Sequence, residues 1–143
     1  MNTLQSYKHS VLLAPITKTS GSTATAYFDS KGYRAAEVLV TIGALKNTNG
    51  AAPKTIKLQE SDDTVATNFA DISGASVSAG PTAGGQVRFN VDLRKRKRYI
   101  QLSFTPETTT NDDQIVSSVV LLGRGEQLPS DTNGFGDTTV KIV

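Results

Sequence analysis

The feature of this sequence that most constrains its fold is a strict alternation of polar and apolar residues. In Gln86–Leu93 every second residue is apolar, and Arg98–Phe104 repeats the pattern. A period of two matches a β-strand with one buried face and does not match a helical surface. Because only a few residues separate the two segments, we expect them to form an antiparallel hairpin.

Two further segments are apolar on both faces. Glu37–Ile42 and Ile115–Leu122 are rich in β-branched residues, which suit strands. A strand that is apolar on both faces needs cover on each side. We therefore expect each segment to lie either inside a sandwich, which we favour, or against another subunit.

The rest of the chain carries shorter strand patterns separated by Gly and Pro, and no convincing helix. This spacing predicts an all-β fold, a jelly-roll-like antiparallel β-sandwich of about eight short strands. The remaining strands are expected at Ser10–Ile16, Ala24–Asp29, Thr55–Gln59, Asn68–Ile72 and Thr138–Val143.

The length of 143 residues predicts a single β-sandwich domain over residues 1–143. We expect a flexible N-terminal arm at 1–9 and a loop-rich C-terminal tail at 123–143. Ser73–Gly85 is rich in Gly, Ser and Ala and predicts a long loop. The β-prone segment 138–143 can pair within its own sheet, which we favour, or add to a neighbour's edge.

Composition removes several kinds of chemistry. The chain has no Cys and one His, which excludes a disulfide, a cysteine nucleophile and a two-His metal site within one chain. Without a nucleophile elbow, His9 is interpreted as a surface residue. We therefore predict no catalytic residue, no cofactor and no metal site. No apolar run is long enough for a signal core or a membrane span, so we expect a soluble protein made in a cytoplasm.

Paired acids are the second pattern considered for chemistry. Asp62-Asp63 and Asp112-Asp113, with Glu60 and Glu107 nearby, lie beside Ser-, Thr- and Asn-rich segments. Asp is favoured in turns because its side chain accepts backbone hydrogen bonds. We interpret both pairs as turn residues, and leave Ca²⁺ binding by a loop as an open alternative.

The most distinctive motif is a run of five cations, Arg94, Lys95, Arg96, Lys97 and Arg98, at the tip of the expected hairpin. Like charges repel, so fold stability alone does not explain them. Three interpretations of the run stay open. It is a solvated tip, it contacts an acidic protein surface, or it contacts phosphate groups. The one aromatic beside it is Tyr99, so no stacking platform is visible and we do not expect nucleic acid as the partner. These five residues are our candidate partner contacts.

Several short segments carry a family resemblance when they are taken together. They are Gly32–Val38, Ile56–Asp63 followed by Phe69–Ile72, Lys97–Leu102 and Val119–Gly123. Their order resembles that of small β-rich capsid decoration, or cement, proteins of tailed bacteriophages. The resemblance covers roughly residues 9–123.

The resemblance implies a non-enzymatic virion protein with no cofactor. Such a protein binds the exterior of an assembled capsid, commonly as a homotrimer at a symmetry axis, and stabilises the shell. Its partner is the major capsid protein, and its place is the capsid surface after synthesis in the host cytoplasm. Edge strands, the Asn2–Ser10 arm and the Arg94–Arg98 tip would make the contacts.

Two alternatives stay open. The first is a head-fibre or tail-tip domain that binds a receptor or glycan, with Phe135, Asp131 and Asn133 on loop tips. The second is the main coat subunit of a small virus, whose basic run would neutralise the genome.

Overall fold

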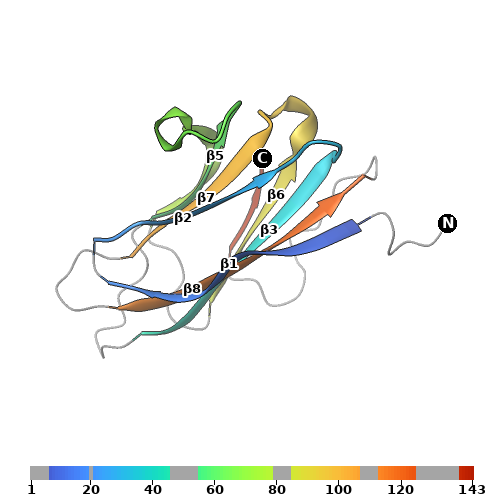
Figure 1. The fold of residues 1–143 in the computed structure, drawn as a ribbon. Coiled ribbons are helices and arrows are strands. Elements are labelled where there is room, and N and C mark those ends of the chain that lie inside the picture. Colours follow the sequence, from blue (N-terminus) through green and yellow to red (C-terminus); the bar gives the residue numbers. More distant parts are fainter. Residues whose placement is uncertain (1–6, 20, 46–54, 79–84, 107–112, 125–138) are drawn as a thin grey trace.

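The computed structural model describes residues 7–19, 21–45, 55–78, 85–106, 113–124 and 139–143 (Figure 1). These residues form nine β-strands and two short 3-10 turns. The strands are β1 (Tyr7–Lys18), β2 (Ala24–Asp29), β3 (Ala35–Leu45), β4 (Thr55–Ser61), β5 (Ala70–Ser78), β6 (Gln86–Asp92), β7 (Tyr99–Thr105), β8 (Gln114–Gly123) and β9 (Thr139–Ile142). The 3-10 turns are η2 (Ala66–Asn68) and η3 (Leu93–Lys95).

The strands form two sheets that pack face to face (Figure 1). The five-stranded sheet has the order β1-β8-β3-β6-β9, and the four-stranded sheet has the order β2-β7-β4-β5. The first strand pairs with the eighth, the second with the seventh, the third with the sixth and the fourth with the fifth. This is the winding of a jelly roll, with β9 added beside β6. The predicted all-β, jelly-roll-like sandwich is confirmed.

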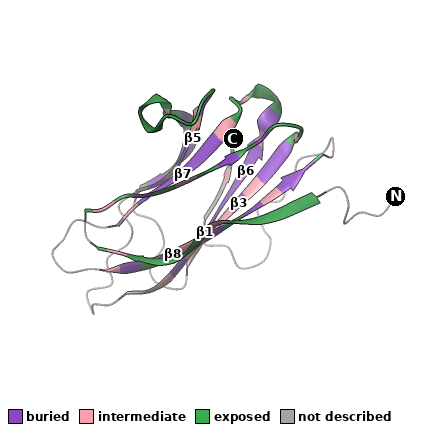
Figure 2. Cartoon of the chain, in the orientation of Figure 1, coloured by how far each residue is buried: buried purple, intermediate pink, exposed green. Residues whose placement is uncertain are grey.

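The core lies between the sheets and consists of the inward apolar residues of both sheets, those of the alternating segments included. Val87, Phe89 and Val91 of β6 are fully buried, as are Leu102 and Phe104 of β7. Each such side chain contributes about 1.5–3 kcal/mol when it is removed from water. Figure 2 shows the buried residues along the inner strands and mostly exposed residues along β1.

The expected hairpin between the two alternating segments is wrong. β6 pairs with β3 and β9, whereas β7 pairs with β2 and β4. The connection through η3 therefore crosses from one sheet to the other. Alternation specifies which face of a strand is buried, but it does not specify the neighbouring strand. The short separation suggested a hairpin that the jelly-roll winding does not contain.

Part of the expected loop Ser73–Gly85 is strand. β5 continues to Ser78, with Ala75 and Val77 buried. The register between β4 and β5 shifts beyond Lys57, and Gly74 has a φ of 81° within this irregularity. A glycine at positive φ allows a bulge that lets a strand continue past a Gly- and Ser-rich stretch. Residues 79–84 lie outside the described part of the chain.

Both ends of the described chain lie in the five-stranded sheet. β1 begins at Tyr7, opposite Gly123, so residues 7–9 belong to the sheet and not to the expected arm. Residues 1–6 and 125–138 lie outside the described residues. β9 pairs in parallel with β6 of the same chain, and the Val143 amide donates to the Asn90 carbonyl at 2.8 Å. The C-terminal segment thus pairs within the chain.

Candidate interaction surfaces

The basic run lies at one end of the sandwich, where the chain passes from β6 to β7. Asp92 Oδ1 accepts a hydrogen bond from the Arg94 amide at 3.1 Å and so caps η3. Arg94, Lys95, Lys97 and Arg98 are exposed, and Arg96 is half-buried. The five cations, from Arg94 to Arg98, therefore gather on one short turn between the sheets.

Two arginines of the run form two-pronged ion pairs. Arg98 donates to Asp29 from Nε at 3.0 Å and from Nη2 at 2.6 Å. Arg94 donates to Asp92 from Nε at 2.8 Å and from Nη2 at 2.7 Å. These hydrogen bonds are the largest cause that lowers the pKa of each carboxyl to about 2. Both carboxylates are therefore charged at neutral pH.

Two acids at the end of β4, one within the strand and one just after it, pair with two more cations. Glu60 Oε2 accepts the Lys97 amide at 3.1 Å, and Lys97 Nζ lies 3.1 Å from Asp62 Oδ2. Arg96 Nη1 lies 3.7 Å from Glu60 Oε1. Among the described residues, Lys95 is the one member of the run with no carboxylate within ion-pair distance. Carboxylates distant in the sequence thus offset the repulsion expected within the run.

Asp63, of the pair Asp62-Asp63, has a turn role. Asp63 accepts the Val65 amide at 2.9 Å and Asn68 Nδ2 at 2.8 Å. The Val65 hydrogen bond is the largest cause that lowers the Asp63 pKa, followed by that of Asn68. Within the described ranges, no group of three His, Asp or Glu side chains is placed to hold a metal ion. Glu107, Asp112, Asp131, Asn133 and Phe135 lie outside the described residues.

The outer face of the five-stranded sheet carries an exposed apolar strip. Val11 lies opposite Val119, and Val119 lies opposite Leu39 on the other side. The exposed fraction is 65% for Val11, 46% for Val119 and 39% for Ile115. Leu39 and Leu121 are half-buried on the same face. We call these five residues the apolar strip. The two-sided apolar segments therefore bury one face in the core and keep the other partly in water.

The strip depends on a close approach between β8 and β3. A Cβ added to Gly43 would come within 2.9 Å of Ile115 Cβ and 3.0 Å of Ile115 Cγ2. Real Cβ atoms do not approach that closely, so Ile115 lies over Gly43 because the glycine has no side chain. The absence of a side chain at Gly43 therefore allows Ile115 to lie close to the backbone of β3 on this face.

Strand β1 is an edge of the same sheet, and in the described structure it pairs with β8 alone. Its second half contains Pro15 and two register shifts, after Val11 and after Leu13. Proline and bulges on an edge hinder the addition of another strand. The regular half, Tyr7–Val11, leaves one row of backbone groups directed away from β8. His9 is exposed there, opposite Leu121.

Neither a family model nor a curated protein is similar to this chain by sequence. Neither 3-10 turn in the described part of the chain has the length and apolar character needed to cross a membrane. A function for this chain must therefore be inferred from the surfaces described above.

Sequence reasoning found the cations but missed their partners and part of the strip. Asp92 lies two residues before Arg94, and this proximity was the one local signal for an ion pair. Asp29 and Glu60 gave no such signal, because each is far along the chain from the cation it pairs with. Val11 belongs to a predicted strand, but its place beside Val119 depends on the pairing of β1 with β8.

Proposed function

We propose that this chain is a non-enzymatic virion structural protein that binds the exterior of an assembled phage capsid and stabilises it. The observation that carries the proposal is the exposed apolar strip. Burial of apolar surface favours association by roughly 25 cal/mol per Å². Contiguous apolar groups on a surface are typical of protein–protein contacts. The strip is a surface that the chain by itself leaves in water and that a partner would cover.

The chemistry of the strip favours a protein partner, the major capsid protein. The strip contains no charged residue, and the regular half of β1 lies directly beside it. A partner can therefore cover apolar side chains and bond to backbone groups at one place. A nucleic-acid partner would need cations that are available for phosphates. Four of the five cations in the run already pair with carboxylates, which disfavours the role of a genome-neutralising coat subunit.

The proposed active form is a homotrimer. Each strip is small, so one copy would bind weakly. Three linked copies on one shell raise the effective concentration of each remaining contact once the first has formed. Three weak contacts that form together can thus hold the trimer on the shell and stabilise the shell.

The first test counts copies of this chain per main coat subunit in particles purified from the source. Quantitative mass spectrometry should give a ratio near one, or a simple fraction of about one-third, as expected for a symmetric shell. A few to a few tens of copies would instead support a fibre, spike or tail-tip protein. Absence from the particles would contradict the proposal.

A second test locates the contact. Particles prepared without this chain are incubated with the wild-type protein or with Val119→Asp. The matched control is Thr25→Asp, which adds the same charge to an exposed position on the other sheet. Loss of occupancy for Val119→Asp alone supports the strip. Equal occupancy for all three proteins would exclude it.

A further inference from the structure

The outer face of the four-stranded sheet carries a straight row of polar side chains. Tyr27 of β2 lies opposite Gln101 of β7, Gln101 lies opposite Gln59 of β4, and Gln59 lies opposite Asp71 of β5. The row crosses all four strands. We call these four residues the amide row.

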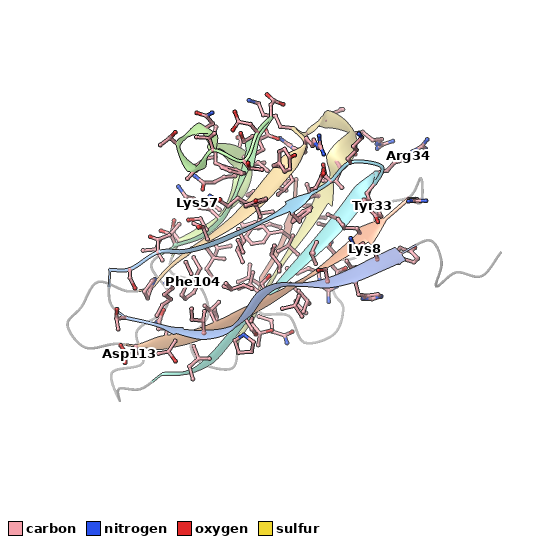
Figure 3. The ribbon with its side chains drawn as sticks, viewed as in Figure 1. Lys8, Tyr33, Arg34, Lys57, Phe104 and Asp113 are labelled. Atoms are coloured by element: carbon pink, nitrogen blue, oxygen red, sulfur yellow. The ribbon has the colours of Figure 1, made fainter. Side chains whose placement is uncertain are left out.

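Hydrogen bonds hold the amide row in one orientation. Gln101 Nε2 donates to Gln59 Oε1 at 3.1 Å, and Gln59 Nε2 donates to Asp71 Oδ1 at 2.7 Å. Lys57 Nζ donates to Asp71 Oδ2 at 2.9 Å; Figure 3 labels this lysine. Each amide nitrogen has a second hydrogen, and the exposed Asp71 carboxylate has further lone pairs. Gln101 is buried, whereas Gln59 is half-buried and Asp71 is exposed. Gln59 and Asp71 are thus fixed in place and still able to bond to a ligand.

An aromatic cluster lies at one end of the row. The Tyr27 ring centroid is 6.0 Å from that of Tyr99, edge to face, and 6.1 Å from that of Phe69. Tyr27 is 50% exposed. Phe69 directly precedes β5, which is at the opposite edge of the sheet from β2. The segment before β5 therefore reaches toward β2 above the outer face.

The segment that positions Phe69 is itself held in place. Asp63 binds both Val65 and Asn68, at 2.9 and 2.8 Å, and so ties the two ends of this segment together. On the other side, the Arg98 guanidinium lies 4.9 Å from the Tyr99 ring centroid, supported by its ion pair with Asp29. A ring cluster that is fixed before binding loses little entropy when a ligand arrives.

We propose that this face binds a neutral oligosaccharide. A pyranose ring has an apolar C–H face and a rim of hydroxyls. The exposed Tyr27 ring offers a flat apolar platform, and Gln59 and Asp71 offer donors and an acceptor beside it. An aromatic surface with a few fixed polar groups is the usual composition of a small-molecule site.

The charges on this face favour a neutral ligand. Lys57 pairs with Asp71, and Arg98 pairs with Asp29. An acidic sugar would meet two carboxylates and cations that are already paired. A dry protein contact is also disfavoured, because it would remove water from these groups without replacing their hydrogen bonds. Sugar hydroxyls can replace that water.

The inference goes beyond the proposed capsid role and uses a different sheet. The 143-residue chain, labelled with ¹⁵N, is titrated with cellohexaose, maltohexaose and chitohexaose up to about 5 mM. Hyaluronan oligosaccharide is the acidic control. We expect saturable chemical-shift changes in β2, β4 and β7 with at least one neutral probe, at a Kd of about 10 μM to 1 mM.

Variants then assign the binding to the face. Tyr27→Ala should weaken it about tenfold or more, whereas Tyr27→Phe should retain most of it because the platform remains. Asp71→Asn tests the polar part independently and should weaken binding about threefold or more. Val119→Ser, on the other sheet, is the control and should bind as the wild type does.

Four outcomes would overturn the inference. They are no saturable shift with any neutral probe, binding that Tyr27→Ala leaves unchanged, binding of the acidic probe alone, and loss of capsid occupancy in Tyr27→Ala without saccharide binding. The last outcome would make the face a protein-docking surface. If Val119→Asp lowers capsid occupancy and no saccharide binds to the wild-type chain, this inference is refuted and the proposed function stands.

Discussion

On the five-stranded sheet the outward side chains of β8 and β1 include Ile115, Val119 and Val11, which are apolar and exposed. On the four-stranded sheet the outward row consists of hydrogen-bonded amides and a carboxylate beside an aromatic cluster. The inner faces of both sheets contribute to one apolar core. One core can therefore support two outer faces with opposite chemistry, because successive residues of a strand point to opposite sides.

The two outer faces suit different kinds of recognition. The apolar strip gains free energy when any complementary dry surface covers it, so its requirement is mainly shape. The amide row gains only from a ligand that replaces the hydrogen bonds of the displaced water. This difference assigns the broad protein contact to the first face and a small polar ligand to the second.

The largest expected effect comes from a charge placed in the strip. Val119→Asp should lower capsid affinity about 100-fold, because a carboxylate would be buried without a partner in the contact. The free energy of unfolding of the free variant should lie within about 1 kcal/mol of the wild-type value, since the position is half exposed. Sedimentation of particles with bound protein and urea unfolding measure the two quantities. A protein that fails to fold would not test the contact, so Val119→Ser serves as the milder variant.

The next effect concerns the bulge that places Asp71 in the amide row. Gly74→Ala puts a side chain on a residue with a φ of 81°, which costs about 1–2 kcal/mol. We expect a lower urea midpoint and chemical-shift changes that reach Gln59. The control is Ser76→Ala on the same strand, where stability should change by less than about 0.5 kcal/mol. Equal midpoints for the two variants would contradict the requirement for glycine at position 74.

The third prediction uses the pH dependence of the ion pairs around the basic run. The pKa values of Asp29 and Asp92 lie at about 2 in the folded chain, below the ordinary 3.8. A lowered carboxyl pKa stabilises the fold above the ordinary value and ceases to do so as the pH falls to about 2. Wild-type stability should therefore decrease over this range more than that of Asp29→Asn/Asp92→Asn. If the urea midpoints of the two proteins change equally with pH over this range, this linkage is excluded.

The smallest effect is expected at Lys95. Lys95→Glu should change stability by less than about 0.5 kcal/mol, because none of the described carboxylates pairs with this lysine. If the tip approaches the shell, the variant slows capsid association at low salt while equilibrium occupancy changes less than about threefold. Lys31→Glu, exposed near Asp29, is the control for net charge. A tenfold loss of occupancy for Lys95→Glu alone would move the main contact from the strip to the tip.

Much of the fold could be predicted from the sequence, but little of the surface chemistry. Ala24–Asp29 was expected with the bounds that the structure has, and the inward faces of Gln86–Leu93 and Arg98–Phe104 were correct. The cation run was found as a motif, yet its expected hairpin tip is a crossing between sheets. The amide row gave no signal, because an isolated Gln in an alternating strand is an ordinary outward residue.

The sequence by itself determined where most strands lie and which side of each faces the core, because the period of two is a local property of the chain. It did not show that the polar Asn90 and Gln101, on the outer sides of β6 and β7, are buried as well. Tertiary structure alone decided which strands became neighbours and which surfaces they formed together. Arg98 meets Asp29 across 69 positions of the chain, and Gln101 meets Gln59 across 42. Such pairs depend on sheet membership and register, which arise only when the whole jelly roll closes around its core.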